Sequence, residues 1–410
     1  MGDRYFKDKN FRVNTLYVFA QGLYWMIVCC TSSMGSAYLS NRGYSTFSIG
    51  LLFALSSLFA IIIQQILSVQ TDSATNFDVV DVLAILGGII TVFLVMALCT
   101  NSKGFVTTIS FLACVTISTI IMPFLNALNF HIERYGIKVN FGVARAAGSS
   151  SFFVISLIAG FFMKTISEKA APFLGFITSV LFTAVIVKIY FELSSIGIRI
   201  KKDYDPMDEK PSSNFEISAI KRYIENYKMF FIFLAGTVCF YFSHVIINNF
   251  FYQIAVNVGG DEATNGGLIA LGAIVELPAM IFFDKIKERF GSKLLLSVSA
   301  VFFFLKILVT TIATSIPMLY FSMLFQALAF ALFVPASVHF VDEIMSDKDA
   351  VKGQAFMTIA MTFSGLLGSV LGGFMFNFFG VTATLFFTTI VTLVGAIVAI
   401  SGLVRINIQN

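Results

Sequence analysis

Charge is scarce in this chain of 410 residues. Only 12% of its residues are Asp, Glu, Lys or Arg, while 57% are hydrophobic. Soluble domains carry about twice that share of charge. The shortage argues against a soluble globular protein, and a net charge of +4 gives no indication of nucleic-acid binding. We therefore expect long apolar segments covered by a lipid bilayer.

Paired cysteines and enzyme motifs are missing as well. The five cysteines lie in apolar stretches without CxxC spacing, which is typical of small packing residues. The chain contains no HExxH zinc motif, no GxSxG nucleophile elbow and no P-loop. We expect no metal, no cofactor and no enzymatic activity, and an intramembrane enzyme is the least favoured class.

Apolar runs of the length that a membrane helix needs recur twelve times along the chain. They are predicted at 13–39, 46–67, 79–100, 104–130, 141–163, 171–192, 226–256, 265–284, 294–313, 316–341, 354–376 and 381–403. The first of them lacks a small-residue cleavage site and is interpreted as a membrane helix, not a secretory signal. The sequence thus predicts an all-α membrane protein with twelve transmembrane helices.

Lys and Arg are distributed unevenly between the loops. With the N-terminus inside, the outer loops hold only Arg42, Lys103, Lys164 and Lys169, and the inner segments hold nearly all the others. Because cytoplasmic loops are enriched in Lys and Arg, both termini are predicted to be cytoplasmic. We expect an integral protein of the plasma (inner) membrane.

The longest polar stretch divides the chain into two halves. We predict a first six-helix bundle at 1–192, a cytoplasmic linker at 193–225 and a second six-helix bundle at 226–410. Within the linker, 213–216 has a capping-box pattern ahead of a short amphipathic run, which predicts an interfacial helix. Weak similarity between the halves favours parallel repeats with a site between them at mid-membrane. We expect the protein to be a monomer.

Four ionisable residues lie inside otherwise apolar stretches: Arg145, His244, Glu276 and Lys306. A charge at the centre of a membrane helix costs about 2.5–3.5 kcal/mol on insertion scales. Such a residue is retained where it faces a wet cavity or a partner. The four residues therefore predict a polar path through the membrane, which points to transport.

The segment between the eighth and ninth spans carries a pattern of charges around a glycine. Asp284, Arg289 and Gly291 belong to it, and this run resembles the short gating loop of the major facilitator superfamily. The corresponding loop of the first half keeps Asp72 but has Ser68 in place of the glycine and no Lys or Arg. We therefore expect no charge latch in the first half, and an ordinary positive-inside loop is the alternative for the second half.

The fifth span begins with a glycine, Arg145 and a second glycine, and Asn126 follows a proline by three residues in the segment before it. This resembles the lactose-permease-like branch of the superfamily, which consists of oligosaccharide/proton symporters. The resemblance implies that Arg145, Asn126 and Phe152 contribute to a sugar site, although the branch commonly has a carboxylate where this chain has Asn126. Hydropathy alone leaves open that Arg145 is a snorkelling anchor at the cytoplasmic edge.

Glu276 precedes a proline in the eighth span, which again resembles that branch, where the acid contacts sugar and couples to protons. Lys306 lies where that branch has a basic residue in the network that couples transport to protons. At 1.5 Å per residue the two differ in height by about 8 Å, a gap that long side chains could bridge as an ion pair. The alternative is that Glu276 and Lys306 form an ion pair that only stabilises the structure and takes no part in transport. His244, with Asn248 one turn on, is either a titrating member of the site or a packing histidine.

Other charge pairs of that branch are missing together, so its proton mechanism cannot be carried over. We expect a secondary transporter of a small hydroxyl-rich solute, first of all a sugar, that works by alternating access. Coupling to protons is left open against uniport. Nucleosides and small aromatic or organic acids are alternative solutes, and a membrane sensor that transports nothing is the alternative of another class.

Overall fold

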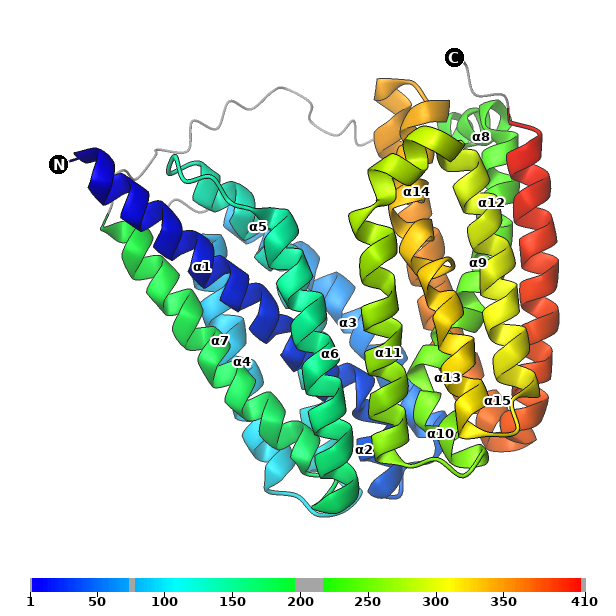
Figure 1. Cartoon of the computed structure of the whole chain (residues 1–410), viewed down its shortest axis with the longest axis horizontal. Coiled ribbons are helices and arrows are strands. Elements are labelled where there is room, and N and C mark those ends of the chain that lie inside the picture. The colour runs from blue at the N-terminus through cyan, green and yellow to red at the C-terminus, as the bar shows by residue number, and fades with distance from the viewer. Residues whose placement is uncertain (1, 74–77, 196–216, 407–410) are drawn as a thin grey trace.

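The computed structural model describes residues 2–73, 78–195 and 217–406, and every regular element in these ranges is a helix (Figure 1). The first part of the chain forms α1 (Gly2–Val28), the π-helical turn η1 (Cys29–Ser33), α2 (Gly35–Asn41), α3 (Thr46–Ser73), α4 (Val79–Leu98), α5 (Phe105–Glu133), α6 (Phe141–Thr165) and α7 (Ala170–Ser194). The second part forms α8 (Ile217–Asn226), α9 (Lys228–Asn249), α10 (Phe251–Asn257), α11 (Glu262–Ile281), α12 (Phe283–Ile312), α13 (Ile316–Leu324), the 3-10 turn η2 (Phe325–Ala327), α14 (Phe330–Ile344) and α15 (Asp347–Val404).

The described residues contain 11 helical stretches that are long and apolar enough to cross a membrane. The last, Asp349–Val404, has 56 residues and would extend about 84 Å, far more than the roughly 30 Å of a bilayer core. It is broken at Gly380, whose φ of 78° lies in the left-handed region that favours glycine. Division of α15 at this point gives twelve spans, which confirms the predicted all-α membrane fold.

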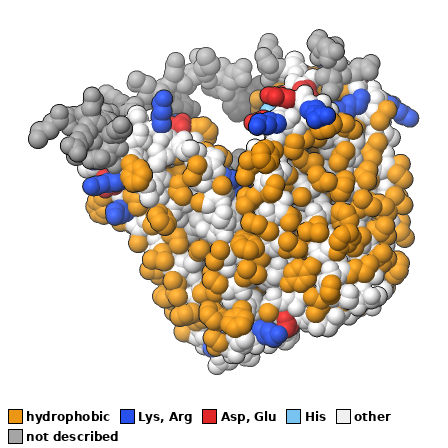
Figure 2. Space-filling model, in the orientation of Figure 1, with side chains coloured by type: hydrophobic (Ala, Val, Ile, Leu, Met, Phe, Trp, Pro, Cys, Tyr) orange, Lys and Arg blue, Asp and Glu red, His pale blue; other side chains and the backbone are white. Residues whose placement is uncertain are grey.

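The helices form two groups that splay apart at one end (Figure 1). One group contains α1–α7 and the other α9–α15, and both chain termini lie at the splayed end. Figure 2 shows hydrophobic side chains over most of one face, with a hollow between the groups at that end. The predicted domain boundaries stay a prediction, because much of the linker, including the capping box at 213–216, lies outside the described residues.

The opposite end, here called the closed end, holds the two groups together. Its apolar core combines Met34 and Ile155 of the first group with Phe250 and Leu268 of the second. Each group also has a separate core of its own. The space between the groups is therefore sealed at one end by side chains that exclude water.

Glycines bring the backbones together at the closed end. A Cβ built on Gly266 of α11 would lie 2.4 Å from the Ser156 carbonyl oxygen of α6. A Cβ on Gly373 of α15 would lie 2.6 Å from the Thr46 carbonyl oxygen of α3. Both distances are shorter than carbon contacts in real proteins, so a side chain at either position would force these helices apart.

Polar groups of the two halves also meet at the closed end. Asn41 donates to Glu262 Oε1 at 2.7 Å, and Tyr252 donates to the same oxygen at 2.9 Å. Lys164 forms an ion pair with Asp261 at 2.6 Å. Burial acts to raise the pKa of Asp261, but hydrogen bonds from Lys164 and Thr264 outweigh it and hold the pKa below its usual value.

The predicted gating loop of the second half is mostly helical. Asp284 and Arg289 belong to α12, which is interrupted at Gly291 with a φ of 71°. The turn glycine is thus where the sequence predicted it, but the residues before it continue a helix instead of forming a loop. Arg289 lies 5.5 Å from the ring of its neighbour Phe290.

The start of α12, around Gly291, is hydrogen-bonded to α14 at the splayed end. Lys287 Nζ lies 3.0 Å from His339 Nδ1 and 3.7 Å from Glu343 Oε1, and Ser292 donates to the same carboxylate oxygen at 2.8 Å. These contacts are not predictable from the sequence, because charged residues at a helix end next to a loop are typical of a solvated edge. The side chain of Asp72 lies outside the described residues, so its gating role stays a prediction.

Candidate functional site

Glu276 and Lys306 are linked through a third residue. Lys306 Nζ donates to Gln326 Oε1 at 2.7 Å, and Gln326 Nε2 donates to Glu276 Oε1 at 2.7 Å. Lys306 is fully buried, with 0% of its surface exposed. The expected direct ion pair between Glu276 and Lys306 is therefore wrong: a neutral amide lies between the two charged groups.

A break in the tenth span puts Gln326 at this position. The α-helix stops at Leu324, continues as the 3-10 turn η2 and resumes at Phe330. The carbonyl group of Ala329 accepts hydrogen bonds from the Phe333 backbone N–H at 3.2 Å and from Ser299 Oγ at 2.6 Å. A mid-helix 3-10 segment often marks a functional region, and here it carries the amide that bridges the two charges.

Arg145 is held by neutral groups of the first half. Its Nη1 donates to Ser149 Oγ at 3.1 Å, and its guanidinium carbon lies 4.3 Å from the centre of the Trp25 ring. Gly148 makes room for this ring, since a Cβ there would lie 2.4 Å from Trp25 Cδ1. The cation–π contact fixes the guanidinium without neutralising it, which leaves donors available to a solute.

His244 lies among aromatic rings on α9. It stacks on Phe330 with centroids 5.2 Å apart and meets Phe303 edge-on at 5.2 Å. The Asn248 amide is 2.9 Å from its Nε2, and its buried Nδ1 has no hydrogen-bond partner among the described residues. The imidazole is therefore positioned tightly, with the amide of Asn248 exposed beside it.

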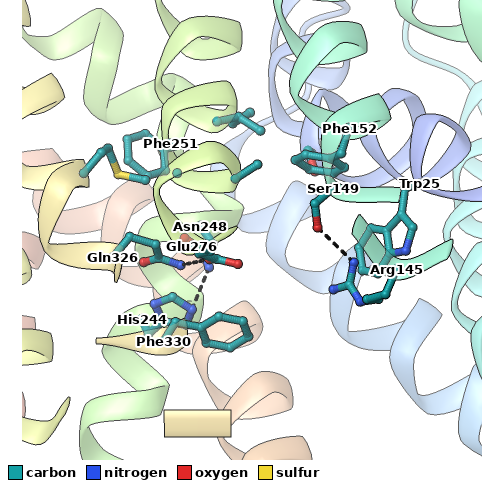
Figure 3. Close-up of a pocket in the computed structure, with 15 residues that line it drawn as sticks. Trp25, Arg145, Ser149, Phe152, His244, Asn248, Phe251, Glu276, Gln326 and Phe330 are labelled. Carbon is teal, nitrogen blue, oxygen red and sulfur yellow. Dashed lines mark hydrogen bonds between the residues drawn. The ribbon is translucent and has the colours of Figure 1, made fainter. Parts of the chain in front are cut away.

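These groups border one cavity of about 290 Å³ between the two halves. Its lining consists of Trp25, Ser33, Arg145, Ser149, Phe152, His244, Asn248, Phe251, Ile269, Gly272, Ala273, Glu276, Met323, Gln326 and Phe330. Figure 3 shows Arg145 with Trp25 and Ser149 on one side, and Glu276 with Gln326, Asn248 and His244 on the other. An apolar pocket with a few convergent polar groups is the usual form of a small-molecule site.

The structure brings five of the predicted substrate-binding residues to this cavity: Arg145, Phe152, His244, Asn248 and Glu276. Two predicted residues do not line it. Asn126 accepts a hydrogen bond from Gln21 within the first half, and Lys306 lies behind Gln326. Solute binding by the five residues stays a prediction, and a direct role for Asn126 and Lys306 finds no support in the lining.

Six polar or aromatic lining residues were missed: Trp25, Ser33, Ser149, Phe251, Gln326 and Phe330. Trp25 is the only tryptophan of the chain and Gln326 is an isolated amide in an apolar run, so each offered a signal. Ser33 offered none. It ends the π-helical turn η1, and such a turn changes which side chains face inward in a way that helical periodicity does not reveal.

The described residues contain no group of three or more His, Cys, Asp or Glu side chains that could hold a metal ion. The cavity instead offers a guanidinium, a carboxyl group, amides, an imidazole and two hydroxyl groups between aromatic rings. Such groups can bind and orient a polar solute. The lining does not include a hydroxyl or thiol nucleophile paired with a base, which acyl transfer through the protein requires.

Comparison with known proteins agrees with this architecture. Over 97% of this chain and 100% of the other, the fold matches the nucleoside transporter NupG at 15% identity and a TM-score of 0.74. A bacterial homologue of the human lysosomal transporter Spinster, inward-facing and unoccupied, matches at 13% identity over 96% and 97% with a TM-score of 0.67. The peptide transporter POT in complex with sulfate matches at 12% identity over 95% and 94% with a TM-score of 0.71.

One relative is similar in sequence over a shorter stretch. Multidrug resistance protein 2 of Bacillus subtilis (strain 168) is 27% identical over 138 residues, which are 34% of this chain and 34% of that protein. The match thus spans about a third of that relative. A model of the MFS_1 like family matches residues 16–387, most of the chain. The chain belongs to the MFS_1 like family and is an integral membrane transporter of the major facilitator kind.

Proposed function

We propose that the protein transports a small hydroxyl-rich solute, in the first instance a sugar, and that it belongs to the lactose-permease-like branch. The solute would bind in the cavity between the halves. Arg145 would donate to its oxygen atoms, and Glu276 would accept from its hydroxyl groups. Ser149 and Asn248 add neutral hydrogen-bonding groups, as recognition of an uncharged polyol requires.

One observation carries this proposal: Arg145 and Glu276 face each other from different halves across one cavity (Figure 3). Each is held by neutral groups of its own half, namely Ser149 and Trp25 for Arg145, and Gln326 for Glu276. A solute that bonds to both links the two halves. Its binding energy can then favour a state in which they close around it.

Alternating access would exchange which end of the cavity is open. The closed end would separate along the glycine contacts while the splayed end comes together, as rocking of the two halves. With both termini in the cytoplasm, the state described here is open to the cytoplasm. We assign the protein to the plasma membrane and expect it to act as a monomer.

Glu276 is the candidate proton carrier if transport is coupled to protons. Glu276 lies on the cavity side of the hydrogen-bonded pair Gln326–Lys306, where solute and water can reach it. A protonated Glu276 can donate a hydrogen bond that the carboxylate cannot. Solute affinity would then depend on its protonation, which is what symport requires.

A nucleoside is the second candidate solute. Trp25, Phe152, Phe251 and Phe330 give the cavity aromatic walls, which suit a flat base as well as the apolar face of a sugar. The fold likeness to NupG, a nucleoside transporter, supports the same alternative. Drug efflux is less favoured, since the relative named for multidrug resistance matches over a third of its length and the fifth span lacks the Gly-Pro signature of drug antiporters.

A thermal-shift screen of purified protein tests the proposal. Monosaccharides, disaccharides, nucleosides and small aromatic carboxylates would be tested against the wild type and against Glu276→Gln. We expect a sugar to raise the melting temperature of the wild type, because a ligand that binds only the folded state stabilises it, and to lose this effect in the variant. A response to carboxylates alone would refute the sugar assignment.

A further inference from the structure

Gln326 occupies a position between a fully buried cation and the carboxyl group that faces the cavity. Its two hydrogen bonds, to Lys306 and to Glu276, are both 2.7 Å long. We infer that Gln326 is the positioning residue through which Lys306 controls the protonation of Glu276. Lys306 then acts on coupling without touching the solute. The inference rests on the proposed transport function and adds a regulatory element to its site.

The chemistry of Lys306, Gln326 and Glu276 determines the direction of the two hydrogen bonds between them. An ammonium group can only donate hydrogen bonds, so the amide of Gln326 must turn its oxygen to Lys306. The NH₂ end of the same planar group then has to point to Glu276. An amide without the lysine could turn over and present its oxygen to the carboxyl group instead. Lys306 therefore holds Gln326 in the orientation that donates to Glu276.

The electrostatic consequence favours the ionised carboxylate. A hydrogen bond that is donated to a carboxylate stabilises the charged form. Because the ammonium group polarises the amide, the bond from Gln326 to Glu276 is stronger than an isolated amide would make it. Glu276 keeps its position at the cavity wall, which a direct ion pair with the buried Lys306 would not allow.

Other groups also face Glu276 and could influence its proton. Arg145 lies on α6 across the cavity, while His244 and Tyr241 lie on α9. These three residues are left unsubstituted in all the variants compared below. Gln326 is distinguished from them by its direct hydrogen bond to Glu276.

Infrared difference spectroscopy of purified protein during a pH titration can test the inference without any solute. The carbonyl band of protonated Glu276 is identified by its absence from Glu276→Gln. In Gln326→Leu we expect the midpoint of this band to move upward by about one pH unit, the size expected for loss of one hydrogen bond to a charged group. Lys306→Met should move it in the same direction. The double variant Gln326→Leu/Lys306→Met should titrate like Gln326→Leu alone.

Two results would overturn the inference. One is an unchanged midpoint in Gln326→Leu. The other is a Lys306→Met shift that persists undiminished when Gln326 is already leucine, since Lys306 would then act directly through space. If Gln326→Leu does not fold, Gln326→Glu serves instead. It still accepts from Lys306 but cannot donate to Glu276 when ionised, so a further upward shift is expected and an unchanged midpoint again contradicts the relay.

A matched control is Gln354→Leu on α15, where the amide donates to the Val338 carbonyl oxygen instead of to Glu276. Its titration should match the wild type. Because no solute enters these measurements, an absent shift counts against the role of Gln326 alone. Absence of any stabilising solute in the thermal-shift screen counts against the proposed function. The two failures are therefore distinguishable.

Discussion

Alanine at Gly266 should open the closed end of the protein. The added Cβ would lie 2.4 Å from the Ser156 carbonyl oxygen and 2.9 Å from Gly160 Cα, both of them backbone atoms of α6. Restoring an ordinary contact of about 3.4 Å requires that α6 and α11 separate by about 1 Å there. A flexible side chain could move aside, but backbone atoms can give way only if the two halves shift.

The size of the shift toward the open state follows from the free-energy cost of overpacking in the closed state. An extra methyl group in a closely packed contact typically costs about 1–3 kcal/mol. Only the closed state bears this cost, so the ratio of open to closed molecules at this end should rise by about 5- to 150-fold. Alanine also favours a helix over glycine by about 1 kcal/mol at most, but that gain is common to both states and cancels.

Spin-label distances provide the assay. Labels at Asn101 and Ser315, exposed residues in loops of the two halves, should report a longer distance in Gly266→Ala than in the wild type, after replacement of the native cysteines. Gly365→Ala on α15 is the matched control, because no atom lies within 4 Å of a Cβ at that position. An unchanged distribution in Gly266→Ala, or an equal shift in Gly365→Ala, would refute the reasoning.

Three further predictions concern charged residues. Arg145→Lys keeps the charge but loses the planar contact with the tryptophan ring, so solute affinity should fall by about 2- to 30-fold, measured as KM for uptake. Arg42, with 0% of its side chain exposed, pairs with Glu168 at 3.6 Å; Arg42→Met should cost about 1–3 kcal/mol and lower the melting temperature. The lowered pKa of Asp261 means that its stabilisation of the closed end is complete above the usual value of 3.8 and is lost as the pH falls through the lowered value. Labels at the closed end should therefore separate only in strongly acidic buffer, or at neutral pH in Asp261→Asn, and not in Lys164→Arg.

Hydropathy was sufficient to predict the membrane spans, whereas the family resemblance depended on the motifs around Arg145, Glu276 and Gly291. Even the division of α15 at Gly380 matches a predicted gap between spans, because a glycine between two apolar runs is where the chain can turn. The same reasoning placed Gly291 correctly. It did not reveal that the charged residues before Gly291 continue α12, since a short polar segment is compatible with a helix or a loop.

The site was predicted only in part, and the errors at Gln326 and Ser33 share one physical cause. A rise per residue gives the depth of a side chain in the membrane, but helix breaks decide which way that side chain points. The break at η2 turns Gln326 toward both Lys306 and Glu276, and the π-helical turn η1 brings Ser33 to the cavity. Depth alone therefore suggested a direct contact between Lys306 and Glu276.

Solute counterflow in proteoliposomes is the most direct test of the central claim that the cavity between Arg145 and Glu276 carries the solute. Vesicles loaded with the unlabelled sugar that best stabilises the protein would be diluted into the labelled form. We predict transient accumulation of label with the wild type and none with Arg145→Met, although both proteins fold. Equal counterflow by the two proteins would contradict the account.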